Sequence, residues 1–370
     1  MARHLFVLRR LVSAYSGRVI DTEEKLAVFL PRLRSAKWVA VDTEADSLHA
    51  YPEKLCLIQI SISSGDELID PLARIHLDPL LGVLADRELI MHGADYDLRL
   101  LRKHHEFVPQ AIFDTMLAAR LLGQRQFSLT HLVAQHLGVA LEKGSQKADW
   151  ARRPLTERME RYARNDTCHL KPLADRLRAE LRDKGRLDWH RESCACLIRQ
   201  CGQNASASTD SAWRIKGSQA LSRPALAVLR EIWRWRDAEA LAANRPPYFI
   251  LSHESLLALA AATVSSRRVE HLIPARFSYR RRTGLTKAIE RGLALPSDEH
   301  PEIYRPLCRR PGDEEKRRFR ELQKHRDAQA VRLGVDPALI ASRAMLAKLA
   351  RDREADAPEL MSWQRELLQL

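Results

Sequence analysis

Two acidic side chains one residue apart, Asp42 and Glu44, end an apolar run that begins at Trp38. In a buried strand both carboxylates lie on the same face, because successive side chains of a strand point to opposite sides. Two carboxylates buried together repel each other unless a cation lies between them. No Lys or Arg occurs between Lys37 and Lys54, so a divalent metal is favoured over a salt bridge, and oxygen ligands indicate Mg²⁺ or Mn²⁺ rather than Zn²⁺. The alternative is a structural pair, with Asp42 capping the next turn and Glu44 in solvent.

Two further stretches place acids at the start of a helix or on one of its faces. The stretch HGADYD begins at His92 and leads from a predicted strand into a helix whose first turn holds Asp95 and Asp97. In the later stretch YARND, Tyr162 and Asp166 are four positions apart and therefore share one face of a helix. Taken singly, each acid has a structural alternative, because first-turn acids favour the helix dipole and Asp166 can be a surface charge.

The elements predicted around these residues form a mixed α/β sheet flanked by helices. Strands joined by short links favour antiparallel neighbours, and the alternation of strand and helix that follows adds parallel ones. Sheets of this kind gather functional residues at the ends of their strands. We predict strands over residues 38–42, 55–61, 67–69 and 89–92, and helices over residues 22–33, 72–84, 95–104, 115–122, 129–137 and 156–181, the last with a kink at Pro172.

Composition indicates a globular protein of more than one domain with a polyanionic partner. The chain has 370 residues, of which 45% are hydrophobic and 29% charged, and this length exceeds one ordinary core. Its formal net charge is +13, and residues 201–370 carry 30 basic and 21 acidic side chains, a net +9. A basic excess of this size favours nucleic acid as the partner. The sequence has no apolar run of membrane-spanning length, and its first residues do not match a signal peptide.

Six cysteines without regular spacing indicate reduced thiols and therefore a cytoplasmic protein. Three of them, Cys194, Cys196 and Cys201, lie near His190 and offer zinc as an alternative. A helix there would put Cys194 and Cys201 on one face and Cys196 elsewhere, so ordinary buried thiols are the favoured interpretation.

Taken together, the acidic stretches resemble the DEDD superfamily of 3′→5′ exonucleases and, in their details, ribonuclease D. The first motif is DTE at residues 42–44, the second is HGADYDLRLL with Asp97 as the matching acid, and the third is YARND with Tyr162 and Asp166. Between them, the run KGSQKADWARRPL that begins at Lys143 also looks like ribonuclease D. The resemblance covers about residues 20–200 and implies a ribonuclease-H-like fold.

The resemblance implies a two-metal-ion mechanism and the residues that serve it. The DEDDh branch has a histidine where this chain has Arg161, whereas Tyr162 matches the tyrosine of the DEDDy branch. We expect Tyr162 to orient the attacking water rather than to remove its proton, because the unperturbed pKa of tyrosine is about 10. By the family pattern, two Mg²⁺ or Mn²⁺ ions are held by Asp42, Glu44, Asp97 and Asp166.

The basic second half resembles an HRDC domain, a small helical module that binds nucleic acid. After a small and polar linker over residues 202–217, the match spans residues 218–295. Residues 304–370 look like a second, diverged copy, because DPALIASR parallels the PYFILS turn of the first. A solvated helix face is the alternative for the basic run at 280–282. We expect RNA contacts from His92, Lys143, Arg280, Arg281 and Arg282.

The leading hypothesis is a metal-dependent 3′–5′ exoribonuclease that releases nucleoside 5′-monophosphates. RNA with a free 3′ end is its expected partner, and tRNA precursors are the substrate that the resemblance implies. A DNA exonuclease is one alternative, because nothing in the sequence reads the 2′-hydroxyl unambiguously. A catalytically silent RNA-binding scaffold is another, although the complete set of acids speaks against it. We expect residues 1–201 to form the exonuclease domain and to degrade short RNA without the second half.

Overall fold

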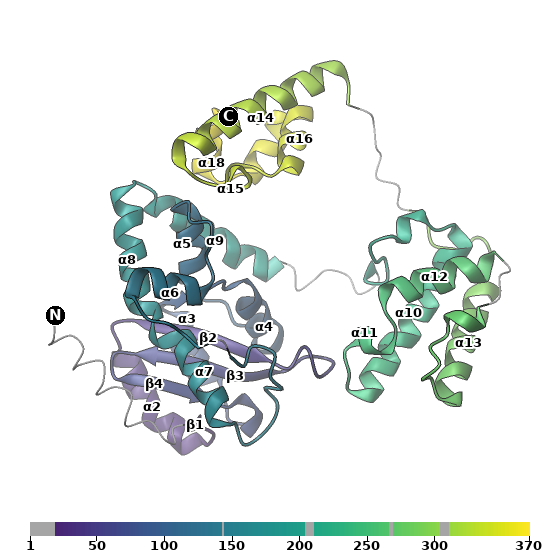
Figure 1. The fold of residues 1–370 in the computed structure, drawn as a ribbon, viewed down its shortest axis with the longest axis horizontal. Coiled ribbons are helices and arrows are strands. Elements are labelled where there is room, and N and C mark those ends of the chain that lie inside the picture. The colour runs from purple at the N-terminus through teal and green to yellow at the C-terminus, as the bar shows by residue number, and fades with distance from the viewer. Residues whose placement is uncertain (1–18, 143, 204–210, 266–268, 304–310) are drawn as a thin grey trace. The chain divides into compact units, whose positions relative to one another are not determined.

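The computed structural model describes residues 19–142, 144–203, 211–265, 269–303 and 311–370. Contacts divide the described residues into two compact units. One comprises residues 19–45, 55–203 and 311–370, and the other residues 46–54 and 211–303 (Figure 1). Among the helices described, none combines the length and the apolar character needed to cross a lipid bilayer.

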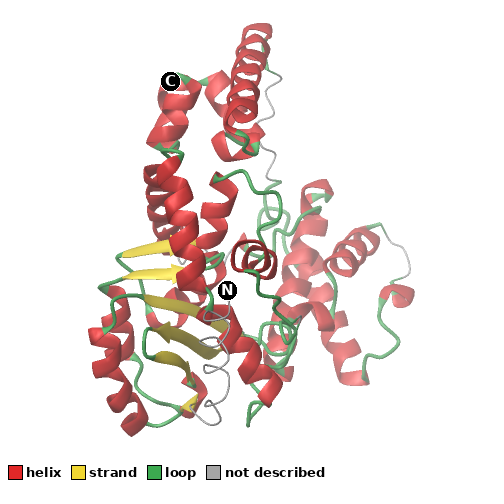
Figure 2. Cartoon of the chain, turned by 60° about the vertical axis from the view of Figure 1, so that its left-hand side comes forward, coloured by secondary structure: helices red, strands yellow, loops and turns green. Residues whose placement is uncertain are grey.

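A six-stranded mixed sheet forms the centre of the first unit (Figure 2). Its strand β2 is antiparallel to β3 on one side and parallel to β5 on the other. The sequence LCLIQISI of β3 is buried along its whole length, as a strand covered on both faces requires. In spatial order the strands are β1 (Val19–Ile20), β4 (Gly65–Ile69), β3 (Leu55–Ile62), β2 (Val39–Ala45), β5 (Glu88–Met91) and β6 (Ala111–Asp114).

Separate hydrophobic cores lie on the two faces of the sheet. Val39 and Val41 of β2 join one core, whereas Ala40 between them joins another. The two-residue alternation of the strand therefore decides which helices each residue faces. The first core includes α2 (Glu23–Ser35), α3 (Asp78–Ala85), α4 (Asp95–His105) and α9 (Leu187–Gln203), and the second includes α5 (Thr115–Leu121), α6 (Leu129–Leu137) and α8 (Leu170–Asp183).

The predicted mixed sheet is confirmed, but four elements differ from the prediction. The sequence pattern missed the short strands β1 and β6. The helix predicted over residues 72–84 is a 3₁₀ turn (Pro71–Ala73) followed by α3, because Arg74 takes a left-handed conformation with φ of 60°. The helix predicted over residues 156–181 is broken into α7 (Glu157–Cys168) and α8. Pro172 explains the break, because it has no N–H for the carbonyl of Cys168 and its ring would clash there.

The second unit is a set of helices around a core of its own. Trp213, Trp235 and Phe277 are buried in this core among aliphatic side chains. From the segment 46–54, Tyr51 donates its hydroxyl to Asp237 at 2.5 Å. The helices are α10 (Arg223–Ala243), α11 (Pro247–Ile250), α12 (His253–Val264) and α13 (Tyr279–Ala294).

Three of the C-terminal helices follow the first three helices of the second unit at a constant offset. The helix α14 (Asp313–Leu333) begins 90 residues after α10, and α15 (Pro337–Ile340) and α16 (Arg343–Arg351) begin 90 residues after α11 and α12. One hydrogen bond also recurs 90 residues later. Arg236 donates to the carbonyl of Leu251, and Arg326 donates to the carbonyl of Ala341. The helices α17 (Arg353–Asp356) and α18 (Ser362–Leu368) end the chain.

These C-terminal helices share the second hydrophobic core of the first unit. Trp363 of α18 stacks on Trp189 of α9, with ring centroids 5.0 Å apart and planes 15° from parallel. Arg186 donates to a backbone carbonyl on each side of this contact, at 2.6 and 2.7 Å. A Cβ at Gly123 would lie 1.9 Å from the carbonyl oxygen of Gly334, so the two backbones touch. A chain cut after residue 201 leaves this core open, which speaks against the expectation that residues 1–201 work alone.

Trp363→Ala should lower the free energy of unfolding of the first unit by about 3–5 kcal/mol, the usual cost of truncating a buried tryptophan. The loss follows from the cavity left against Trp189. Urea denaturation followed by circular dichroism measures it. Val331→Ala is the control, because that side chain is 83% exposed, and it should change stability by less than about 0.5 kcal/mol. Equal midpoints for the two variants would show that the C-terminal helices do not stabilise the unit.

Candidate active site

The strand β2 carries the first two acids at the middle of the sheet. Opposite them on β3 lie Gln59, which pairs with Asp42, and Leu57, which pairs with Glu44. Carboxylate oxygens of Asp42, Glu44 and Asp166 all lie within 4.8 Å of one another. The prediction that Asp42 and Glu44 share a face is therefore confirmed. In the described ranges, this group is the one cluster of His, Cys, Asp or Glu side chains with the geometry to hold a metal ion.

Asp166 reaches β2 because α7 is fastened to the sheet. Thr167, the next residue, shares a hydrogen bond of 2.8 Å with Ser61 of β3, and both side chains are buried. Arg164 donates to the backbone carbonyl of Asp66 in β4. The hydroxyl of Thr156 caps the helix at its first turn. These bonds hold the C-terminal part of α7 against the sheet, and they thereby fix the position of the Asp166 carboxylate relative to β2.

Asp97 comes from α4, on the other face of β2. Its side chain is 6% exposed, and its Oδ1 accepts a hydrogen bond of 2.5 Å from the hydroxyl of Thr43. Its negative charge is close enough to raise the pKa of Asp42. Asp95, two residues earlier, is an exposed residue that pairs with Arg99 one turn along the helix. The structure therefore agrees with the prediction that Asp97 is the inward acid of this motif and Asp95 is not.

Burial and the charges of nearby acids raise the pKa values of all four acids. Burial, followed by the charges of the other three acids, holds the pKa of Asp42 well above its ordinary value. Burial and the charges of Asp166 and Asp97 raise the pKa of Glu44 to about 9. Burial is also the main cause that raises the pKa values of Asp97 and Asp166 to about 7. A divalent cation would relieve this repulsion, and the carboxylate oxygens are the donors that Mg²⁺ and Mn²⁺ prefer.

Tyr162 lies one turn before Asp166 on α7 and donates its hydroxyl to that carboxylate. Burial and the nearby negative charges raise its pKa above the ordinary value, so the phenol stays neutral at physiological pH. The ring is held by Trp150, whose centroid lies 6.1 Å away. A Cβ at Gly144 would lie 2.8 Å from the Cδ2 atom of the ring, so this loop presses against the tyrosine.

Arg153 fixes the loop that covers Tyr162. Its guanidinium donates to both carboxylate oxygens of Asp70, at 2.6 and 2.7 Å, and to the carbonyl of Cys56. Sequence reasoning noted this stretch only as part of the resemblance. The sequence feature that could have indicated this role is the motif DWARRP, in which Trp150 packs against Tyr162 and Arg153 anchors the loop to Asp70. Thr43 was missed as well, because it was treated as a spacer between two acids.

Of the predicted RNA contacts, His92 belongs to the first unit, which carries the acids. It follows β5 directly, and its Nδ1 lies 2.8 Å from the hydroxyl of Thr115. That hydroxyl donates to the carbonyl of Met91, so the imidazole Nδ1 is the donor in the first contact. Burial lowers the pKa of His92, which favours the neutral ring. Lys143 lies outside the described residues.

The three predicted arginine contacts already have partners within the second unit. Arg280 and Arg281 both pair with Glu239, at 2.6 and 3.1 Å. Arg282 donates to three backbone carbonyls at the start of α13. Their contact with RNA stays a prediction, but Arg280 and Arg281 bond to α10 and Arg282 bonds to the loop before α13.

The zinc alternative finds no support among the described residues. The Nε2 atom of His190 lies 2.9 Å from the carbonyl oxygen of Asp114, and Cys194 contacts the same ring at 3.5 Å. Cys196 instead accepts a hydrogen bond from Gln200. These side chains are therefore parts of the packing of α9.

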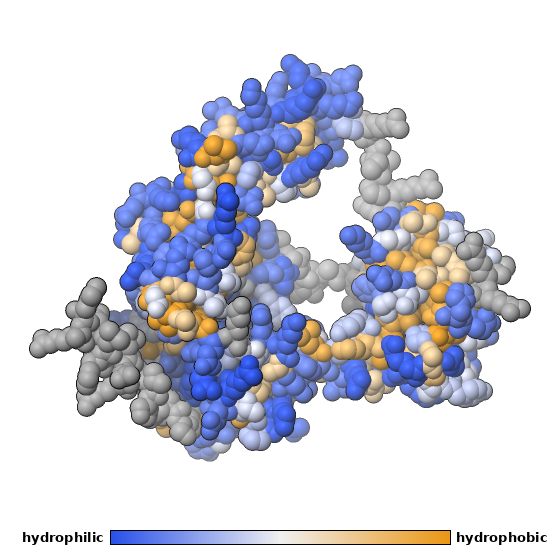
Figure 3. Space-filling view, viewed as in Figure 1, coloured by the Kyte–Doolittle hydropathy of each residue, from blue (hydrophilic) through white to orange (hydrophobic). Residues whose placement is uncertain are grey.

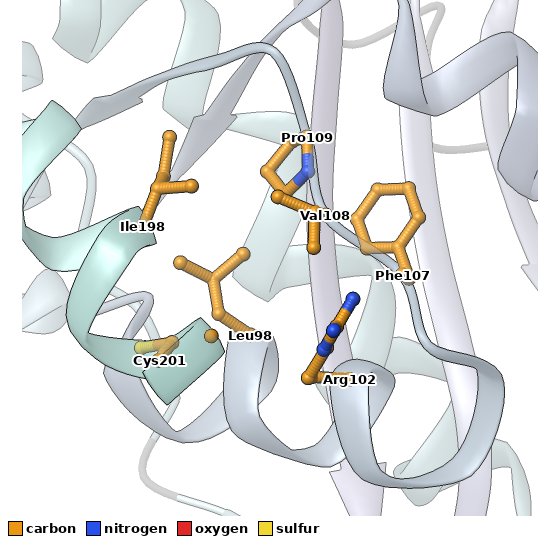
Figure 4. A pocket seen from close by; sticks show the side chains of 8 residues that line it. Leu98, Arg102, Phe107, Val108, Pro109, Ile198 and Cys201 are labelled. Carbon is orange, nitrogen blue, oxygen red and sulfur yellow. The ribbon is translucent and has the colours of Figure 1, made fainter. Parts of the chain in front are cut away.

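A small pocket between α4 and α9 offers no room for a ligand. Its volume is about 10 Å³, which suits at most one water molecule. Arg102 on α4 and Cys201 on α9 line it together with apolar groups. Figure 4 shows these neighbours, which are Leu98, Phe107, Val108, Pro109 and Ile198.

Comparison with known proteins agrees with this geometry. A family model described as 3′-5′ exonuclease matches residues 18–182, and one described as HRDC domain matches residues 225–267. Ribonuclease D of Granulibacter bethesdensis is 32% identical over 365 residues, which are 95% of this chain and 90% of that protein. The chain belongs to the ribonuclease D family. Ribonuclease D of Gluconacetobacter diazotrophicus is also 32% identical, over 94% of this chain and 89% of its own.

The solved structure of a ribonuclease D has the same fold. Escherichia coli RNase D matches with a TM-score of 0.75 and 24% identity, over 96% of this chain and 99% of that one. Membership in the ribonuclease D family confirms the sequence-based prediction of a 3′–5′ exoribonuclease whose mixed sheet is followed by helical domains. The matched HRDC segment lies within the predicted span 218–295.

In EDTA, the free energy of unfolding should fall as the pH rises from about 5 to about 9. The folded pKa values of Asp97 and Asp166, about 7, and of Glu44, about 9, lie above those of the unfolded chain. The folded protein therefore binds more protons than the unfolded chain, and it loses stability as these groups ionise. Thermal unfolding at several pH values measures the slope.

Mn²⁺ should reduce this slope, because a bound cation stabilises the ionised carboxylates. Glu44→Gln should flatten its upper part between about pH 7 and pH 9. Stability that rises with pH in EDTA would show that these acids do not share a buried site.

Proposed function

We propose that this protein shortens RNA from its 3′ end with two divalent metal ions, Mg²⁺ or Mn²⁺, and releases nucleoside 5′-monophosphates. The observation that carries the proposal is the group of Asp42, Glu44 and Asp166, whose carboxylate oxygens lie within 4.8 Å of one another. Asp97 is held beside them by Thr43. When bound at such a site, the two cations supply a Lewis acid and lower the pKa of water, which is the chemistry of phosphodiester hydrolysis.

The residues of the site have three further roles, which are to hold the cations, to orient water and to keep the geometry fixed. The four acids hold the cations, and binding relieves the repulsion among them. Tyr162 keeps its hydroxyl neutral next to Asp166, where it can orient a water molecule by hydrogen bonding. The fastened helix α7 and the central strand β2 keep these groups in one geometry, so little ordering is required when RNA arrives.

We infer that structured RNA, with tRNA precursors as the specific expectation, is the substrate. Residues 201–370 carry a net charge of +9, which suits the phosphates of a folded RNA body. Figure 3 shows that hydrophilic side chains cover most of the visible surface of the C-terminal helices. Contacts to phosphate fix the position of the RNA and add affinity without reading its sequence.

We also infer a cytoplasmic location. Free thiols, as in the five described cysteines, suit an enzyme of the cytoplasm.

We also propose that residues 304–370 form a second HRDC-like domain. Support comes from the offset of 90 residues between α10–α12 and α14–α16. The caps recur with the same spacing, because Ser252 and Ser342 both accept a backbone hydrogen bond at the start of a helix. The residues after α10 and α14, Asn244 and Gly334, both take a left-handed conformation. Two copies of one scaffold account for these coincidences.

The deciding experiment gives the full-length protein labelled single-stranded RNA and DNA of equal sequence, with Mg²⁺, Mn²⁺ or EDTA. We expect stepwise shortening of the RNA from its 3′ end with either metal and none in EDTA. Preference for DNA would identify a DNA exonuclease, and binding without shortening would identify a silent scaffold. Full activity in EDTA would contradict the metal site.

Matched aspartate variants serve as controls for this experiment. Asp42→Asn and Asp97→Asn should each reduce turnover below detection, because each removes a metal ligand. Asp95→Asn should keep most of the activity, because Asp95 is exposed and paired with Arg99. The reverse order for Asp95 and Asp97 would show that the second motif was assigned to the wrong acid.

Tyr162→Phe should lower the rate by about 10²-fold, the size of a general acid–base effect. The ring keeps its packing against Trp150, and only the hydroxyl is lost, so RNA affinity should change little. Single-turnover kinetics give the rate, and fluorescence anisotropy gives the dissociation constant in Ca²⁺ or EDTA. A variant with the normal rate would leave Tyr162 a packing role alone.

A further inference from the structure

Thr43 lies between two acids of the site but faces away from them. Asp42 and Glu44 point to the side of β2 where α7 brings Asp166, whereas Thr43 points to the side of α4. Its hydroxyl donates to Oδ1 of Asp97 over 2.5 Å, a contact between residues 54 positions apart. Both side chains are only 6% exposed, so water does not compete for this hydrogen bond.

In this contact Thr43 is the donor and the carboxylate of Asp97 is the acceptor. An ionised carboxylate only accepts hydrogen bonds, so the single hydroxyl proton of Thr43 is committed to Asp97. Oδ1 is the atom that receives it, and backbone N–H groups of Thr43 and Asp97 also hydrogen-bond to this carboxylate. A hydrogen bond to a charged acceptor in a buried site is among the stronger ones in proteins.

Asp97 needs such support because its neighbours repel it. It lies outside the group of three carboxylates whose oxygens are within 4.8 Å of one another, and it comes from a different helix. The negative charges of the other acids tend to turn its carboxylate away when no cation is bound. The hydroxyl of Thr43, together with its backbone N–H, ties that carboxylate to β2, the strand that carries two of the other ligands.

We propose that Thr43 is a positioning residue that holds Asp97 in place as a metal ligand. The inference rests on the proposed metal-dependent function and adds a residue to it. Groups that orient a ligand in this way are typically worth about 10–100-fold in metal affinity. Thr43 thereby links α4 to β2 where both elements contribute acids to the site.

The test compares Thr43→Val with Thr43→Ser. Valine keeps the shape and the strand preference of threonine but has no hydroxyl, and serine keeps the hydroxyl. Isothermal titration of the full-length protein with Mn²⁺ in the absence of RNA should show about 10–100-fold weaker binding for Thr43→Val. Thr43→Ser should restore most of the affinity. Activity measured against Mg²⁺ concentration should shift in parallel, with the maximal rate approached at high metal concentration.

Control variants distinguish a failure of the Thr43 proposal from a failure of the proposed metal site. Thr263→Val removes a hydroxyl that bonds only within its own helix, in the second unit, and should leave Mn²⁺ binding unchanged. Circular dichroism in EDTA checks folding, and Thr43→Ala replaces Thr43→Val if valine does not fold. Asp97→Asn must weaken Mn²⁺ binding, or the proposed metal site itself fails. Weak binding in Asp97→Asn with normal binding in Thr43→Val would overturn the role of Thr43 alone.

Discussion

Four carboxylates, from β2, α4 and α7, lie close together in a partly buried site and impose the constraint on which the rest of the structure depends. Their charges repel, and burial removes the water that would screen them. Burial and the charges of neighbouring acids raise the pKa values of all four. The chain holds the acids in place with neutral hydrogen bonds, from Thr43 to Asp97 and between Thr167 and Ser61. Positive charge is left for divalent cations to supply.

Basic side chains close to the site are used elsewhere. Arg153 pairs with Asp70 and anchors the loop over Tyr162. Arg164, two residues before Asp166, donates to a backbone carbonyl of β4. These arginines therefore stabilise the elements around the site without neutralising its carboxylates. A site built with arginine among its acids would have lower carboxylate pKa values and less to gain from a cation.

Much of the site was predictable, because its geometry follows from short-range rules. The two-residue period of a strand puts Asp42 and Glu44 together, and the four-residue spacing in a helix puts Tyr162 beside Asp166. Contacts between distant segments were not predictable. Nothing local indicates that Thr43 meets a carboxylate 54 residues away. The strand β6 was also missed, because four residues carry too little pattern to separate a buried strand from a loop.

For the C-terminal helices too, the sequence indicated the internal pattern but not the contacts with distant parts of the chain. Periodicity and turn residues predicted a second copy of the first helical module, and the recurrence of the Arg236 contact at Arg326 supports it. The two groups of helices nevertheless differ in what they pack against. Residues 311–370 share a core with the sheet unit through the stacked pair Trp189 and Trp363, whereas residues 211–303 enclose a core of their own. A repeat inherits the internal contacts of its scaffold, but its surface is free to change, so sequence patterns predict the scaffold better than its docking.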